Sequence, residues 1–224
     1  MTRVLMVLTS HDRLGDSGRS TGFHVGEAAH PYAVLRAAGI DVDFASPRGG
    51  AAPADSADRS DPLQAAFLDD PAVQAQLADT QPAEAVDPAR YDAVLFVGGH
   101  GTMWDFPGNA ALAATARAVY ESGGAIAAVC HGPSALVDLT LSDGSLLVAG
   151  KTVAGFTDAE EEAVGLTEVV PFLLASTLRE RGANHVGAGL WEPHVEVDGR
   201  LVTGQNPASA RPLAEALVRV LDER

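Results

Sequence analysis

Short apolar runs alternate along the chain with longer Ala-rich segments in which apolar residues recur at helical spacing. The runs are rich in β-branched residues and show no polar alternation, as is typical of strands buried on both faces of a parallel sheet. They occupy Val4–Leu8, Val42–Ala45, Ala93–Val97 and Ala125–Val129. Strands that alternate with helices predict βαβ units, and therefore an α/β fold of three layers, α/β/α, around a mostly parallel central sheet.

Helices are predicted over the segments of helical period. These segments are Glu27–Ala38, Ala110–Ser122, Pro133–Val137 and Pro171–Arg181, with a final helix that starts from Asn206-Pro207. Glycines that can take a left-handed conformation follow three of them and mark helix ends. Between the last two helices, Val195–Val202 is predicted to be a β-hairpin around Asp198-Gly199.

Residues 49–90 interrupt this alternation with a stretch rich in Ala, Asp and Pro. Its Asp-Pro pairs are typical helix starts, because Asp caps the first turn and Pro fits its first position. Short helices are predicted near Leu63–Leu68 and Ala72–Ala78. The segment is either a solvated linker or a helical cap over an active site, and the apolar residues in its helices favour the docked cap. We therefore expect one α/β domain over residues 1–224, with residues 49–90 inserted as the cap.

Composition narrows the possible partners and the compartment. Thirty acidic residues against 15 basic residues give a formal charge of −15, and such a surface repels phosphate backbones and anionic lipid. No apolar run approaches the ~18 residues of a membrane span, and the first ten residues lack a signal-peptide cleavage site. The single cysteine, Cys130, excludes an internal disulfide and suits a reducing compartment. We expect a cytoplasmic protein with neither a nucleic-acid nor a membrane partner.

Cys130 stands where a predicted strand runs directly into a helix start. Small residues lie two positions before and after it, at Ala128 and Gly132. This spacing is the steric requirement of a nucleophile elbow, a strained turn that projects a nucleophile above the sheet. The following helix would place its positive end near the sulfur and favour the thiolate. A cysteine after a Val-rich strand can also be a simple buried residue, but the Gly-Pro that follows favours the elbow.

Two further segments carry candidate chemistry. Gly98-Gly99-His100-Gly101 follows a predicted strand, where glycines bare N–H donors that can form an oxyanion hole beside a thiolate. The pattern is not GxGxxG, and no phosphate-loop lysine follows it. Glu27 lies among small and apolar residues four positions before Pro31. A carboxyl in an apolar pocket has a raised pKa and can donate to a thiolate, although this segment taken alone favours a solvent-facing helical Glu.

Taken together, these motifs resemble the ThiJ/PfpI superfamily, within the class I glutamine amidotransferase-like (flavodoxin-like) fold. The resemblance is greatest to its branch of heat-shock chaperones with glutathione-independent glyoxalase (glyoxalase III) activity. It rests on segments that extend from the first helix to the last: Glu27–Pro31, Gly98–Pro107, Ala127–Pro133, Gly155–Asp158 and Val202–Ala210.

The resemblance implies a role for each matching residue. Cys130 would be the nucleophile, His131 its base partner and Glu27 the carboxyl that hydrogen-bonds the sulfur. The acidic third member falls on Glu161, with Asp158, Glu160 and Glu162 close enough for the assignment to slip. Backbone N–H groups of Gly99 and His131 would form the oxyanion hole, and His100 and Phe156 would line the pocket. The branch also implies a homodimer and no cofactor.

Two other features compete with this assignment. His194-x-Glu196 has the spacing that glutamine amidotransferases use for a catalytic base and its orienting carboxylate, although an exposed hairpin face explains it equally well. The remaining histidines lack ligand-like spacing to a cysteine or to one another, apart from His24 near His30. We therefore expect no metal site.

Three functions are compatible with these residues. The first is a cysteine-dependent glyoxalase that converts methylglyoxal-type dicarbonyls to 2-hydroxy acids in a stress-protection role. The second is a cysteine hydrolase, such as an amidase, a peptidase or a deglycating enzyme, built on the same nucleophile. The third is a stress-induced holding chaperone, or a redox sensor in which Cys130 is oxidised.

Overall fold

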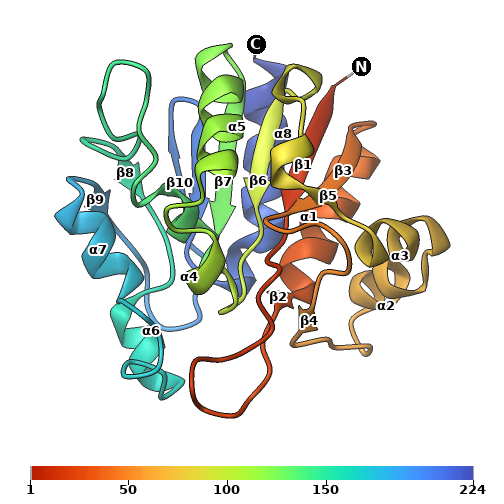
Figure 1. Cartoon of the computed structure of the whole chain (residues 1–224), viewed down its shortest axis with the longest axis horizontal. Coiled ribbons are helices and arrows are strands. Elements are labelled where there is room, and N and C mark those ends of the chain that lie inside the picture. The colour runs from red at the N-terminus through yellow and green to blue at the C-terminus, as the bar shows by residue number, and fades with distance from the viewer. Residues whose placement is uncertain (1, 224) are drawn as a thin grey trace.

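A seven-stranded sheet forms the centre of the computed structural model, which describes residues 2–223 (Figure 1). The strands follow the order β10-β11-β7-β6-β1-β3-β5, and every neighbouring pair is parallel except β10 with β11. Their bounds are β1 Arg3–Val7, β3 Asp41–Ser46, β5 Gln81–Pro82, β6 Ala93–Phe96, β7 Ala125–Val129, β10 Val195–Asp198 and β11 Leu201–Gly204. The mostly parallel sheet predicted from the apolar runs is confirmed.

Helices cover both faces of this sheet, which gives three layers (Figure 1). Helices α1 (Val25–Ala37) and α8 (Ala210–Asp222) contact each other on one face, and α5 (Ala110–Glu121) packs on β6 and β7 from the other. Shorter helices are α4 (Thr102–Asp105), α6 (Asp158–Ala163) and α7 (Leu174–Glu180). Two small parallel pairs lie outside the main sheet: β2 (Phe23–His24) with β4 (Ala54–Asp55), and β8 (Thr152–Val153) with β9 (Asn184–His185). None of the helices that the structure describes is both long and apolar enough to cross a membrane.

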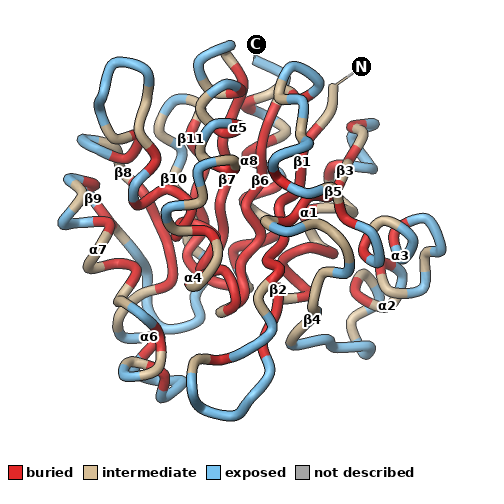
Figure 2. The backbone as a smooth tube through the Cα atoms, in the orientation of Figure 1, coloured by how far each residue is buried: buried red, intermediate tan, exposed pale blue. Residues whose placement is uncertain are grey.

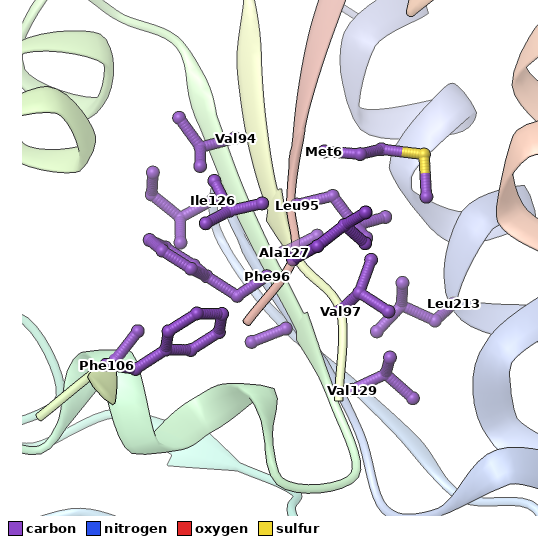
Figure 3. Packing of buried hydrophobic residues seen from close by; sticks show 14 of the residues in the cluster. Met6, Val94, Leu95, Phe96, Val97, Phe106, Ile126, Ala127, Val129 and Leu213 are labelled. Atoms are coloured by element: carbon purple, nitrogen blue, oxygen red, sulfur yellow. The ribbon is translucent and has the colours of Figure 1, made fainter. Parts of the chain in front are cut away.

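The central strands are buried on both sides, which explains why their sequences do not alternate. Every residue of β6 and β7 is fully buried (Figure 2). Side chains at the end of β6 and in the residue after it point to opposite faces, with Phe96 toward Phe106 and Val97 toward Leu213 of α8 (Figure 3). Each such side chain contributes roughly 1.5–3 kcal/mol through burial. These strands therefore give the site a rigid base at their carboxyl ends.

Two of the predicted helices differ from the observed ones. Residues Gly132–Leu136 form a 3-10 helix rather than an α-helix, as is common for short connecting segments. The helix predicted from Pro171 starts at Leu174, after a bend. The residue at its N-cap is Leu173, whose side chain cannot cap the helix, and the first turn is instead bonded by the remote Asp158, which accepts from the Ser176 N–H at 3.3 Å. The sequence therefore had no local marker for this start.

The segment of residues 49–90 contains the two predicted helices, α2 (Pro62–Asp69) and α3 (Pro71–Ala78). Asp61 and Asp70 cap them as predicted, since each carboxylate accepts N–H bonds from the first turn. Helix α2 packs on α1, and α3 packs on α2 and β3. The Phe67 ring of α2 lies 5.4 Å from the ring of Tyr32 and 6.0 Å from that of Phe44, centroid to centroid.

We expect Phe67→Ala to lower the free energy of unfolding by about 3–5 kcal/mol, since it empties a site between two packed rings. Denaturant unfolding of the variant measures this loss. The exposed residue Gln74 of α3 offers a control, and Gln74→Ala should change stability by at most ~0.5 kcal/mol. If Phe67→Ala were as mild as the control, the segment would behave as a solvated linker.

Candidate active site

Cys130 follows β7 directly and adopts a left-handed backbone conformation, with φ of 59°. This conformation is costly for a residue with a side chain and persists only where neighbours hold it. The Cys130 N–H donates to the Gly204 carbonyl at 2.9 Å, and the Cys130 carbonyl accepts from the Phe156 N–H at 2.8 Å. A Cβ on Gly132 would lie 2.2 Å from the Phe96 carbonyl oxygen, so only glycine fits there. The strained turn that the sequence predicts at Cys130 is therefore present.

A chain of polar groups leads from the sulfur to a carboxylate. The Cys130 Sγ lies 3.3 Å from Nδ1 of His131, and Nε2 of His131 lies 2.8 Å from Oε2 of Glu161. The other oxygen of Glu161 lies 3.0 Å from Nε2 of His100. Cys130, His131 and Glu161 are all buried. One carboxylate thus holds two imidazoles, one of which faces the thiol.

Helix α6 brings Glu161 to this position, and its neighbouring acidic residues have other partners. Thr157 and Glu160 form a capping box at the start of α6. The Glu160 carboxylate also accepts from Asn206 at 2.8 Å and from the Trp191 N–H at 3.1 Å. Of the acidic residues that the sequence left open, the structure therefore places Glu161 against His131. The Thr-x-x-Glu pattern of a capping box was the available signal for this helix.

The surroundings of the two side chains keep His131 neutral and Glu161 ionised at neutral pH. Burial, followed by the nearby His100, lowers the pKa of His131 to about 4. Burial would raise the pKa of Glu161, but the hydrogen bonds from His100 and His131 outweigh it and bring this pKa to about 2. With its Nε2–H donated to Glu161, His131 has a free lone pair on Nδ1. That nitrogen can accept a proton from the thiol.

Glu27 of α1 lies beside Cys130, where both side chains approach Gly98, and it is completely buried. Burial raises its pKa to about 8, so this carboxyl is protonated at neutral pH and can donate to sulfur. Burial also raises the pKa of the Cys130 thiol, and an ionised Glu27 would raise it further. The expectation that a helix start would make Cys130 a ready thiolate is therefore wrong. The following 3-10 helix is short, and burial opposes the charge.

Glycines allow this close packing around the thiol. A Cβ on Gly98 would lie 2.3 Å from Oε2 of Glu27 and 2.9 Å from the Cβ of Cys130. Gly99 has a φ of 109°, and its Cβ would lie 2.4 Å from the Gly22 carbonyl oxygen. Both Gly99 and His131 line the cavity above Cys130. The oxyanion hole formed by their N–H groups remains a prediction.

The cavity above Cys130 has a volume of about 190 Å³. It is lined by His24, Glu27, Asp55, Ser56, Gly99, His100, Cys130, His131, Phe156, Val164, Trp191 and Pro207. The non-glycine residues with positive φ in the part of the chain that the structure describes are Ser56, Cys130 and Trp191, and all three lie in this lining. Strained backbone conformations persist only where the surrounding structure holds them, and in proteins they cluster at functional sites.

The structure thus brings together all seven residues predicted for the site, and it adds some that the sequence did not indicate. His24, Asp55, Ser56 and Trp191 are the main additions, and no local motif marks them. Asp55 and Ser56 belong to the segment of residues 49–90, whereas no residue of α2 or α3, both fully described, lines the cavity. The predicted role of that segment as a cap remains a prediction.

Two other candidate features lie away from the thiol. His194 Nε2 and Glu196 Oε1 pair at 2.8 Å, but neither residue lines this cavity. A wider hollow of about 480 Å³ opens within residues 12–20, where the lining contains no cysteine or histidine. Neither feature therefore competes with Cys130 as the centre of nucleophilic chemistry.

The candidate metal ligands in the described part of the chain belong to the same site. His100, His131 and Glu161 place one ligand atom each within 4.8 Å of one another. Two imidazoles and a carboxylate are a donor set that zinc accepts. In the apo geometry each Glu161 oxygen pairs with one of the imidazoles. The expectation of no metal site remains a prediction.

Known proteins share this sequence and this geometry. The model of the DJ-1/PfpI family matches residues 20–220. Among curated proteins, the chain is 34% identical to the Saccharomyces cerevisiae glutathione-independent glyoxalase HSP31, over 98% of this chain and 97% of the relative. It is 32% identical to glyoxalase 3 of Candida albicans, over 99% of each chain.

Solved structures agree over the same length. Glyoxalase III of Candida albicans superposes with a TM-score of 0.91 at 32% identity, over 98% of this chain and 97% of that one. The rapid encystment protein of Francisella tularensis superposes with a TM-score of 0.96 at 39% identity, over 99% of each chain.

We expect burial of Glu27 to make stability depend on pH. Its folded pKa lies above the ordinary value of 4.5, so between pH 4.5 and about 8 the unfolded chain releases this proton while the folded chain keeps it. Relative to Glu27→Gln, the wild type should therefore lose about 2–3 kcal/mol of unfolding free energy from pH 5 to pH 7. Denaturant unfolding at both pH values measures this. As a control, the exposed Glu162→Gln should show the same pH dependence as the wild type. If the stability difference between the wild type and Glu27→Gln did not change with pH, Glu27 would not be a buried, protonated carboxyl.

Proposed function

The chain belongs to the DJ-1/PfpI family, and on that premise we propose that it is a cysteine-dependent, glutathione-independent glyoxalase. Its substrates would be small dicarbonyls such as methylglyoxal, converted to 2-hydroxy acids in a stress-protection role. The observation that carries the proposal is the buried chain of hydrogen-bonding groups from Cys130 through His131 to Glu161, with the protonated Glu27 beside Cys130. Relatives that match over nearly their whole length carry the glyoxalase name.

The geometry supplies each group that the first step needs. Nδ1 of His131 takes the thiol proton as Sγ of Cys130 bonds to the aldehyde carbon, C1, of the dicarbonyl. The imidazolium then gives this proton to the aldehyde oxygen, which becomes the hydroxyl of a hemithioacetal, and His131 is neutral again. Glu161 stabilises the imidazolium that forms, because its carboxylate already holds Nε2. The N–H groups of Gly99 and His131 would stabilise the developing oxyanion.

The next steps move protons and need no external oxidant. Neutral His131 removes the proton from C1 and passes it to the C2 oxygen, which gives an enediol. Protonated Glu27 then gives its proton to C2 while His131 takes the proton of the C1 hydroxyl, so C1 is oxidised to a thioester and C2 is reduced to an alcohol. Water cleaves the bond between sulfur and C1, which releases the 2-hydroxy acid and restores the thiol. These roles agree with the pKa values, since neutral His131 can accept a proton and protonated Glu27 can give one near neutral pH.

The cavity favours small uncharged substrates over the alternatives. Its volume of about 190 Å³ leaves no room for a polypeptide, and its lining contains no Lys or Arg to hold an anionic group. A hydrolase acting on small amides would use the same nucleophile. A redox-sensor role is less well supported, because Cys130 is 3% exposed and burial raises the pKa of its thiol. The homodimer implied by the family resemblance remains a prediction.

We expect turnover of methylglyoxal and glyoxal without glutathione, in buffer that contains EDTA. Cys130→Ala should reduce kcat at least ~10³-fold, since no other group can form the thioester. Formation of the 2-hydroxy acid is the measurement. Full activity in Cys130→Ala would exclude covalent catalysis by this thiol, and loss of wild-type activity in EDTA would reveal a required metal. Release of ammonia from amides, with no turnover of dicarbonyls, would favour the hydrolase.

The choice of Glu161 among its acidic neighbours predicts a contrast between two variants. Glu161→Gln removes the charge that stabilises protonated His131 and should lower kcat about 10²-fold. Glu162→Gln alters the exposed neighbour on the same helix and should leave kcat unchanged. Equal losses in both variants would contradict this assignment.

A further inference from the structure

Glu27 has no hydrogen-bond partner that could exchange a proton with solvent. Its carboxyl is completely buried, and neither oxygen has a partner within hydrogen-bond distance, although Cys130 and the Gly98 backbone lie close enough to offset somewhat the rise in its pKa that burial causes. An acid that gives or takes a proton in every turnover must be restored each time. Its neighbours that can carry a proton are the Cys130 thiol, which the substrate occupies during the reaction, and the imidazole of His24.

His24 lies between this carboxyl and solvent. It ends β2, immediately before α1, and its ring lines the cavity with 24% of the side chain exposed. Its Nδ1 lies 4.0 Å from Oε1 of Glu27, and this nitrogen is also buried without a hydrogen-bond partner. The gap is about 1 Å longer than a hydrogen bond. A small rotation of the His24 ring would close this gap, because neither Nδ1 of His24 nor Oε1 of Glu27 has a hydrogen bond that the rotation would break.

The surrounding backbone directs the ring toward Glu27. The His24 N–H donates to the Gly98 carbonyl at 3.0 Å, and β2 pairs with β4, where His24 lies opposite Asp55. A Cβ on Gly26 would lie 3.2 Å from Cε1 of the ring and 3.4 Å from Nδ1. Glycine at position 26 thus leaves the space in which the ring lies.

The charge state of His24 suits proton transfer in both directions. Burial lowers its pKa to about 4, against the opposing effect of Asp55 and with a further lowering by His30 and His100. The ring is therefore neutral at pH 7, with one nitrogen protonated and the other a free acceptor. Such a ring can take a proton on one nitrogen while it releases one from the other.

We propose that His24 is a proton relay that connects the buried Glu27 carboxyl with solvent. When Glu27 is ionised, Nδ1–H gives it a proton as Nε2 takes one from solvent, and the reverse sequence removes a proton. The relay leaves the overall reaction unchanged, since every proton that enters on one side leaves on the other. This inference rests on the proposed glyoxalase function and on Glu27 as the acid that gives its proton to C2.

Isotope exchange distinguishes a relay from a structural role. In D₂O with methylglyoxal, the wild type should place solvent deuterium at C2 of the 2-hydroxy acid, because the proton that Glu27 gives to C2 has come from solvent through His24. His24→Phe keeps a ring of similar size but removes both nitrogens. It should reduce deuterium at C2 several-fold and kcat about 10-fold. NMR or mass spectrometry of the product gives the deuterium content.

Matched variants separate the relay from loss of folding. Gly26→Ala retains His24 but displaces its ring, so the deuterium content should fall as it does in His24→Phe. In His24→Ala, added imidazole should restore the deuterium content, which it could not do if the side chain only supported the fold. As a control, His30→Gln alters a histidine within α1 whose Nε2 lies 2.6 Å from Oδ2 of Asp61, and it should give wild-type deuterium content.

The outcomes for the relay and for the proposed function differ. Normal turnover with unchanged deuterium content in both His24→Phe and Gly26→Ala would overturn the relay and leave the glyoxalase in place. A wild-type product without solvent deuterium at C2 would likewise overturn the relay alone. If the wild type did not turn over dicarbonyls at all, both the proposed function and the relay would be wrong.

Discussion

A cysteine in the left-handed region of backbone space persists only where its surroundings leave it no other conformation. At Cys130 these surroundings are a fully buried strand on one side and, on the other, a turn in which Gly132 packs on the end of β6. Every other feature of the site is arranged around the resulting direction of the sulfur. His131 reaches it from the same turn, Glu27 from α1 and Glu161 from α6 by way of His131.

Burial governs the chemistry of this site more than any single charge does. It raises the pKa values of Glu27 and Cys130 and lowers those of His131 and His24, so these groups are held neutral near pH 7. Glu161 is the exception, because two imidazoles donate to its carboxylate. The same burial lowers the free energy of unfolding, because the buried carboxyl of Glu27 has lost its hydrogen bonds to water without gaining others.

Strain and unpartnered polar atoms occur together around one small cavity. Ser56 and Trp191, from segments far apart in the chain, share with Cys130 both a positive φ and a place in the lining. His24 and Glu27 contribute buried polar atoms that lack partners there. Natural proteins retain such departures where function requires them. Their convergence on Cys130 agrees with the nucleophile elbow inferred from the spacing of Ala128 and Gly132.

The sequence by itself determined the sheet, the elbow and the helix starts capped by Asp, because each depends on neighbours close along the chain. The apolar runs located β1, β3, β6 and β7 to within a residue or two, and Ala128 and Gly132 marked the turn at Cys130. The likeness to a known family added Glu161 but left it among four acidic residues. Only the tertiary structure decided which acid reaches His131, that Cys130 is too buried to ionise easily, and that His24 faces Glu27. Each of these depends on distances between segments remote in sequence, and no local pattern encodes such a distance.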